Sequence, residues 1–205
     1  INMIVFCGGF SNSDVLGSAK GWAGAFLYNP KAKEALEKFY SREDTLSLGS
    51  CNGCQLMVEL NLINPNHKHR SHQTHNVSRK FESEFLGVTI PKNNSVMFGS
   101  LSGDKLGLWV AHGEGRFYLP EPEDHYNIIA KYNYAEYPGN PNGSDYNVAG
   151  ICSDDGRHLA MMPHLERAIF PWQQAWYPAD HIHDDVTPWI EAFVNARKWI
   201  EQTQR

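Results

Sequence analysis

The chain has 205 residues and a mass of 23.2 kDa, with 41% hydrophobic and 20% charged residues, enough to form one sizeable core. A formal net charge of −5 argues against nucleic acid and anionic membranes as partners. The mean hydropathy is −0.48, and no apolar run approaches the roughly 18 residues of a transmembrane helix. Four cysteines in so long a chain predict reduced thiols and a cytoplasmic protein.

Up to about residue 60 the sequence alternates short apolar runs with helical patterns. The expected elements are a strand at 4–7, a helical stretch at 15–28, a helix at 30–40, a strand at 45–48 and a helix after Cys51 through Leu60. Glycines follow each of the two strands. Strand, loop and helix in repetition are typical of a parallel α/β sheet.

The remainder of the chain has shorter, alternating patterns separated by Gly, Pro and Asn. We expect strands within 80–90, 106–110 and 126–134, a hairpin of 148–152 with 157–162, and a final helix with Thr187 as cap and Pro188 as first residue. The sequence thus predicts one α/β domain over residues 1–205, with a mostly parallel sheet and an added antiparallel section.

The strongest local signal is the pattern Gly49-x-Cys51-x-Gly53, which lies between an expected strand and an expected helix. A nucleophile on such an elbow sits at a helix N-terminus, where the helix dipole and free N–H groups favour a thiolate. The N–H of Asn52 would then face an oxyanion formed by attack of Cys51. The alternative is a tight turn that holds a small buried cysteine.

A cysteine nucleophile requires a base and a group that orients the base. Of the ten histidines, His164 directly follows an apolar strand, and Glu166 lies two residues further on. Both would lie at the carboxyl edge of the sheet, as would the elbow. The loop Gly8-Gly9 follows another strand, and the N–H of Gly9 is a second candidate oxyanion donor. The alternatives are a surface histidine with a solvated glutamate, and a plain turn.

Together these residues resemble the class I (triad) glutamine amidotransferases. The resemblance covers nearly the whole chain and is carried by 8–17, 51–55, 76–82, 111–116 and 156–164. It implies a flavodoxin-like fold of three layers in which an N-terminal strand-helix unit is missing, so that the chain would be a C-terminal fragment of a longer polypeptide. It also implies the roles that follow: Cys51, His164 and Glu166 catalytic, and Gly8, Gly9, Asn52 and Gln55 in oxyanion or substrate binding.

The resemblance is strongest to members that serve purine biosynthesis. It implies that L-glutamine is hydrolysed to glutamate and ammonia through a cysteine thioester. The ammonia would reach a synthetase domain of the same polypeptide, where ATP and Mg support conversion of formylglycinamide ribonucleotide to formylglycinamidine ribonucleotide. No Gly-x-x-x-x-Gly-Lys-Ser/Thr motif occurs in this chain, and no cofactor is expected here. Asn12-Ser13 and Leu165 depart from the family pattern, which usually has an aromatic residue with glycine, and a proline.

Two alternatives remain open at this stage. The first is another class I amidotransferase or a cysteine hydrolase with the same fold. The second is a structural domain with zinc on Cys51, Cys54 and two histidines of an exposed polar loop at 64–76. The candidate histidines are His67, His69, His72 and His75. No metal site is our leading expectation, with Cys54 in packing or beside the site.

The segment His112-Gly-Glu114-Gly-Arg116 supports two interpretations. The resemblance places it at the border of the site or at a domain interface, whereas the residues alone are equally consistent with a glycine-rich turn with solvated charges. Cys7 and Cys152 lie in apolar runs and are expected to be small core residues.

Overall fold

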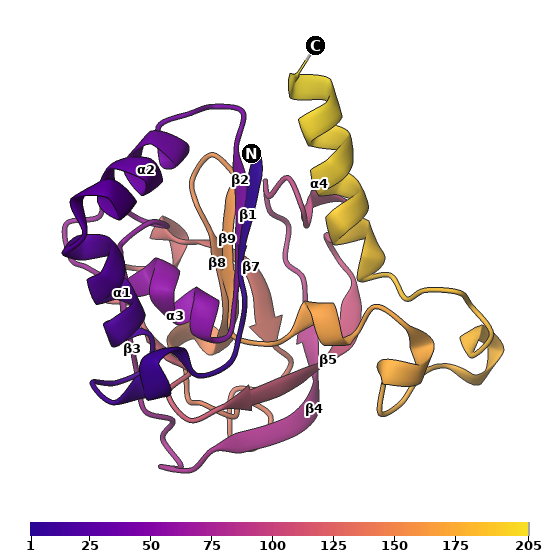
Figure 1. Ribbon diagram of the computed structural model, residues 1–205. Helices are drawn as coiled ribbons and strands as arrows, with labels where there is room; N and C mark the ends of the chain where they lie inside the picture. Colours follow the sequence, from indigo (N-terminus) through magenta and orange to yellow (C-terminus); the bar gives the residue numbers. More distant parts are fainter. Residues whose placement is uncertain (205) are drawn as a thin grey trace.

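The computed structural model describes residues 1–204, which form a mixed α/β domain (Figure 1). A seven-stranded sheet has the order β1-β2-β9-β8-β7-β4-β5, and β3 pairs with β6 in a small second sheet. The strands are β1 (Met3–Phe6), β2 (Leu46–Ser50), β3 (His72–Thr74), β4 (Glu82–Thr89), β5 (Lys105–His112), β6 (Arg116–Tyr118), β7 (Asn127–Tyr132), β8 (Val148–Cys152) and β9 (His158–Met161). The α-helices are α1 (Lys20–Leu27), α2 (Pro30–Tyr40), α3 (Asn52–Glu59) and α4 (Ile190–Thr203).

The α/β fold class predicted from the sequence is confirmed, and the two kinds of strand pairing occupy different parts of the sheet. Strands β1, β2 and β9 are parallel, whereas the pairings from β9 through β8, β7 and β4 to β5 are antiparallel. Both sections predicted for the sheet are present, but the antiparallel one, expected as the addition, contributes more pairings than the parallel one. The parallel section carries the candidate site, because Cys51 directly follows β2 and His164 lies three residues after the end of β9.

Three layers result, with α1, α2 and α3 on one face of the parallel strands and α4 on the other (Figure 1). One core cluster joins Leu46 and Leu48 of β2 to Trp189 and Ala192 at the start of α4. The second cluster packs α1 and α3 against the opposite face, with Met57 fully buried. Every residue of β2 and β9 is buried, as expected for strands covered by helices on both faces of the sheet.

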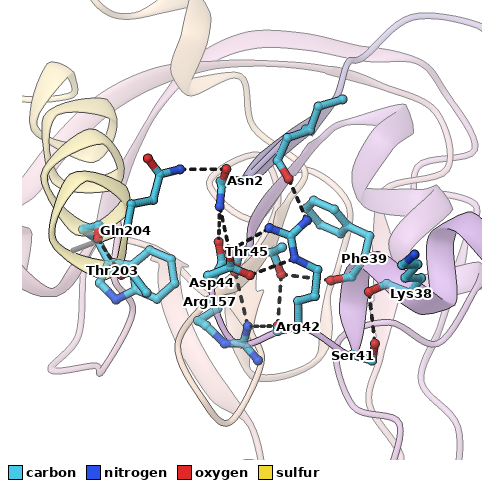
Figure 2. Close-up of polar contacts among 12 residues, drawn as sticks. Asn2, Lys38, Phe39, Ser41, Arg42, Asp44, Thr45, Arg157, Thr203 and Gln204 are labelled. Carbon is cyan, nitrogen blue, oxygen red and sulfur yellow. Dashed lines mark hydrogen bonds and ion pairs between the residues drawn. The ribbon is translucent and has the colours of Figure 1, made fainter.

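The two ends of the chain are held together by polar contacts (Figure 2). The Asn2 side chain accepts a hydrogen bond from Gln204, which directly follows α4, at 2.9 Å and donates to Asp44 before β2, also at 2.9 Å. Arg42 donates to the carbonyl of Ile1 and to Asp44, and Arg157 before β9 donates to the carbonyl of Arg42. These contacts fix the amino ends of β1, β2 and β9 relative to one another.

Four sequence predictions need correction. The helix expected at 15–28 begins only at Lys20, since Gly17 and Ala19 have positive φ, and residues 11–14 form a 3-10 turn. The final helix begins at Ile190, although Thr187 does accept the Trp189 N–H at 3.3 Å.

The polar stretch 64–76 is not only an exposed loop, because His72–Thr74 forms β3 and the side chain of Asn76 is fully buried. Cys7 is exposed, whereas Cys152 is buried as expected.

Candidate active site

Cys51 lies on a sharp turn between β2 and α3. Its backbone has φ of 51° and ψ of −107°, a conformation that costs a non-glycine residue about 1–3 kcal/mol. The turn is held from β9, since the Cys51 N–H donates to the carbonyl of Met161 at 2.9 Å. Cys51 is 6% exposed and directly precedes the first residue of α3, so its side chain lies at the N-terminus of that helix.

Three glycines near Cys51 have no room for a side chain. A Cβ on Gly49 would lie 2.6 Å from the carbonyl oxygen of Gly53, and a Cβ on Gly53 would overlap the Phe6 carbonyl. A Cβ on Gly8 would lie 2.7 Å from Cε1 of His164 and 3.2 Å from Cβ of Cys51. The glycines therefore allow α3, β1 and the Gly8 loop to close around the cysteine.

His164 and Glu166 form a short hydrogen bond at the end of β9. The His164 Nδ1–H donates to Glu166 Oε1 at 2.6 Å, and Ser50 donates its hydroxyl to Glu166 Oε2 at 2.9 Å. His164 is anchored through its backbone, which donates to the carbonyl of Trp109 at 2.8 Å. Burial opposes charge on the imidazole, yet hydrogen bonds to Cys51 and Glu166 raise the pKa of His164 from 6.5 to about 9. Burial also opposes charge on Glu166, but the bond from His164 holds the pKa of that carboxyl below its usual value.

A cavity of about 200 Å³ opens beside Cys51 and His164. Its wall includes Gly9, which has φ of 118°, and Asn52, the first residue of α3. The exposed rings of Phe10 and Phe81 also border it, with centroids 6.4 Å apart. Drug-sized ligands occupy pockets of ~300–1,000 Å³, so this cavity suits a smaller molecule such as one amino acid.

Asn52 and Gln55 connect the wall of the cavity to two loops. The Asn52 amide donates to Gln55 Oε1 at 3.1 Å and to Asp14 Oδ1 at 3.3 Å, while Gln55 donates to the carbonyl of Glu114 at 2.8 Å. The Glu114 carboxylate in turn accepts the Ser18 N–H at 3.2 Å. Gln55, expected in oxyanion or substrate binding, is thus engaged within the protein along one edge of the cavity.

Two charged residues in the cavity wall were not predicted from the sequence, namely Asp14 and Arg167. Asp14 ends a run of three non-glycine residues with positive φ, of 50°, 55° and 47° for Asn12, Ser13 and Asp14. Such a run is costly and needs support from its surroundings. The sequence signals that could have pointed to them are positional. Asp14 lies in the stretch 8–17 that resembles the amidotransferase family, and Arg167 is adjacent to Glu166.

His112 is buried at the back of the cavity. Burial, followed by the nearby charge of His164, lowers the pKa of His112 to about 3, which keeps the ring neutral. Asn142 lies 3.2 Å from His112 Nε2, and Asn76 donates to the His112 carbonyl at 2.8 Å. The turn after His112 is therefore built around buried amides rather than being solvated, and Arg116 is half-buried in β6.

The contact of Cys54 with the histidine stretch of the zinc alternative is to an amide side chain, not to a histidine. Cys54 is fully buried and exchanges a long contact of 3.8 Å with Gln73, and burial raises its thiol pKa well above the usual value. Of the four loop histidines, His69 instead bonds Glu121 at 2.7 Å. Within residues 1–204, no group of three or more His, Cys, Asp or Glu side chains is placed to hold a metal ion. In that same range no helix is long and apolar enough to cross a bilayer.

Comparison with known proteins points to one family. A model of the CobB/CobQ-like glutamine amidotransferase domain matches residues 1–200. The chain is 45% identical over 218 residues to a probable phosphoribosylformylglycinamidine synthase, chloroplastic/mitochondrial, of Arabidopsis thaliana, and 41% identical over 222 residues to phosphoribosylformylglycinamidine synthase of Homo sapiens. These alignments cover 97% and 96% of this chain, but only 16% and 17% of the two relatives.

Among solved structures, the chain is similar to a structure of PurLQS from Thermotoga maritima. The TM-score is 0.69 at 24% identity, over 100% of this chain and 80% of that one. At this level of identity the similarity supports the fold, including the predicted class I amidotransferase architecture. The printed name of the Arabidopsis relative places that protein in chloroplasts or mitochondria, so the cytoplasmic location stays a prediction.

Proposed function

The chain belongs to the CobB/CobQ-like glutamine amidotransferase family, and from that premise we propose that it hydrolyses L-glutamine to glutamate and ammonia, with Cys51 as nucleophile. The observation that carries the proposal is the arrangement at the ends of β2 and β9. There a strained cysteine borders a cavity of amino-acid size together with a histidine of raised pKa, and that histidine is hydrogen-bonded to a carboxylate.

The first half of the proposed reaction forms a thioester. The Cys51 thiolate attacks the side-chain amide carbon of glutamine, and the N–H groups of Asn52 and Gly9 stabilise the oxyanion. His164, protonated and oriented by Glu166, gives its proton to the departing nitrogen. The carbon–nitrogen bond breaks, ammonia leaves, and a γ-glutamyl thioester remains on Cys51.

The second half releases glutamate. Neutral His164 takes a proton from water, and the resulting hydroxide attacks the thioester carbon. The carbon–sulfur bond breaks, and the Cys51 thiolate returns as glutamate leaves. The sum is glutamine and water giving glutamate and ammonia. No metal or cofactor is required in this domain for either half.

The use of the ammonia is the second part of the proposal. The chain spans about one sixth of the length of the curated relatives that it matches. Those relatives are named phosphoribosylformylglycinamidine synthase. We infer that the ammonia serves an ATP- and Mg-dependent synthetase domain, which converts formylglycinamide ribonucleotide to formylglycinamidine ribonucleotide. Glu114 and Arg116, which are half-buried, are candidates for the side that faces this domain. His112 is too buried to touch a partner and lies beside the cavity instead.

Labelling with 6-diazo-5-oxonorleucine, a glutamine analogue that alkylates nucleophiles, tests the assignment of Cys51. One adduct at Cys51 is expected by peptide mass spectrometry, with no adduct in Cys51→Ala and normal labelling in Cys7→Ser, the exposed control cysteine. An adduct at another residue, or labelling that persists in Cys51→Ala, would overturn the proposal. Failure of Cys51 to react would instead favour a cysteine hydrolase with another substrate.

A further inference from the structure

The cavity beside Cys51 contains one carboxylate, from Asp14, and one guanidinium, from Arg167. Free glutamine is a zwitterion whose ammonium and carboxylate both lie on the carbon two methylene groups away from the reacting amide. We propose that Asp14 binds the α-ammonium group of the substrate and so selects α-amino acids over simple amides. The proposal rests on the glutaminase function proposed above and names the residue that gives it specificity.

The hydrogen bonds of Asp14 leave one of its oxygens available. Oδ1 accepts from the Ala19 N–H at 3.3 Å and from the Asn52 amide at 3.3 Å. Oδ2 has only a contact of 3.5 Å with the Ser18 hydroxyl. A carboxylate has about four acceptor positions, so Oδ2 retains capacity for a strong donor. An ammonium group only donates hydrogen bonds and could therefore bind to Oδ2.

The charge of Asp14 also lacks a counter-ion in the protein. In residues 1–204, no lysine, arginine or histidine nitrogen lies within 4.0 Å of this carboxylate. The nearest lysine in sequence, Lys20, is paired with Glu59 of α3 at 3.6 Å. An anionic group that borders a small cavity and has no cation paired with it favours a cationic ligand group there.

Asp14 and the nucleophile border the same small cavity. Asn52 directly follows Cys51, and its side chain reaches Asp14. One residue thus links the atom that reacts with the amide to the group proposed to hold the far end of the substrate. The left-handed conformation of residues 12–14 holds the carboxylate against the cavity, and the bond to Ala19 at the start of α1 fixes it there.

Asp14→Asn is the sharpest test, because asparagine tolerates positive φ and its side chain has nearly the same size as that of aspartate. Its amide oxygen can still accept from the Ala19 N–H. The negative charge is lost, and an NH2 donor replaces the oxygen proposed to accept from the ammonium group. Turnover would be followed by ammonia release from L-glutamine and from glutaramate, which is glutamine without its α-ammonium group. Alkylation of Cys51 would be followed with 6-diazo-5-oxonorleucine, which carries the ammonium, and with iodoacetamide, which does not. Asp124→Asn, an exposed residue outside the cavity, is the matched control.

For Asp14→Asn we expect kcat/KM for L-glutamine to fall about 30- to 1,000-fold, mainly through KM, with glutaramate changed less than threefold. Labelling by the diazo reagent should slow to a similar extent, while the iodoacetamide rate stays within about twofold. Equal slowing of both reagents, or an unchanged preference for L-glutamine over glutaramate, would overturn the role of Asp14. If neither reagent alkylates Cys51 in the unsubstituted chain, the proposed glutaminase function fails instead.

Discussion

The strand pair β2–β9 carries a hydroxyl or thiol beside a histidine at both of its ends, and only one end resembles an active site. At the carboxyl end lie Cys51 and His164, bordering a cavity. At the amino end, Ser47 and His158 are direct register partners, and the Ser47 hydroxyl is 3.0 Å from His158 Nδ1. The Tyr40 hydroxyl bonds Ser47 at 2.9 Å, and its ring lies 4.5 Å from the His158 ring.

The pKa values of the two histidines are shifted in opposite directions. Burial lowers the pKa of His158 to about 4, since no carboxylate hydrogen-bonds its ring. His164 is also buried, but Cys51 and Glu166 raise its pKa to about 9. Ser47 lies within a regular strand and is fully buried, whereas Cys51 is on a strained turn beside a cavity. A nucleophile next to a histidine is therefore not sufficient, and neither is a cavity, since His158 also borders one. The carboxylate on the histidine and the strained turn under the nucleophile make the difference.

Replacing the nucleophile-type atom at each end should produce the largest contrast. Cys51→Ala is expected to lower kcat for glutamine at least ~10⁴-fold, as for other covalent triads. Ser47→Ala should leave kcat within about twofold but reduce the free energy of unfolding by about 1–3 kcal/mol, because the buried His158 and Tyr40 lose their partner. Ammonia release and urea unfolding measure the two effects. Strong loss of turnover in Ser47→Ala would contradict the contrast.

Glu166→Gln should make His164 resemble His158. We expect kcat to fall about 10²- to 10⁴-fold, and the imidazole titration followed by NMR to move from a midpoint near 9 towards lower pH. Because the folded pKa of His164 exceeds its ordinary 6.5, its charge stabilises the fold fully below about pH 6.5, and this contribution is lost as pH rises through 9.

His158 gives the opposite sign and serves as the internal control. Its pKa is depressed from 6.5 to about 4, so the neutral ring contributes stability above about pH 6.5 that is lost as pH falls through 4. Glu166→Gln should leave the His158 titration in place. A midpoint for His164 that stays near 9 in the variant would show that Glu166 does not raise its pKa.

Gly8→Ala should produce a smaller loss confined to the catalytic end. The added methyl would press on Cε1 of His164, so kcat is expected to fall about 10-fold to 100-fold as the ring is displaced. Gly99→Ala is the control, because its Cβ would meet nothing within 4 Å. Equal activity of the two variants would show that His164 can move without cost.

The sequence allowed the elbow and the base to be located because both depend on local order. Cys51 directly follows one strand and His164 lies three residues after its parallel neighbour, and parallel neighbours end at the same edge. The hairpin around residues 153–156 was predicted for a similar reason, since its turn is rich in Asp and ends in Gly156, with φ of 77°. These features need few contacts from distant parts of the chain.

Other features depend on contacts that no local pattern contains. Helix α1 begins at Lys20, and the Asp14 carboxylate that accepts from Ala19 is also held by Asn52 of α3. Strand β3 exists because it pairs with β6, more than 40 residues later in the chain. For the same reason Asp14 could not be recognised as a site residue until α3 was placed beside its loop.

The parallel ladder between β2 and β9 has a consequence for how the chain can change in length. Ser50 is the register partner of Met161, so the number of residues after this pair on each strand sets the separation of nucleophile and base. Each residue of extended chain advances about 3.3 Å and reverses the side on which the next side chain lies. One deletion between Met161 and His164 would therefore displace the imidazole and turn it away from Cys51. Insertions in the turn at 153–156 leave this pair in place, and length variation should be tolerated there.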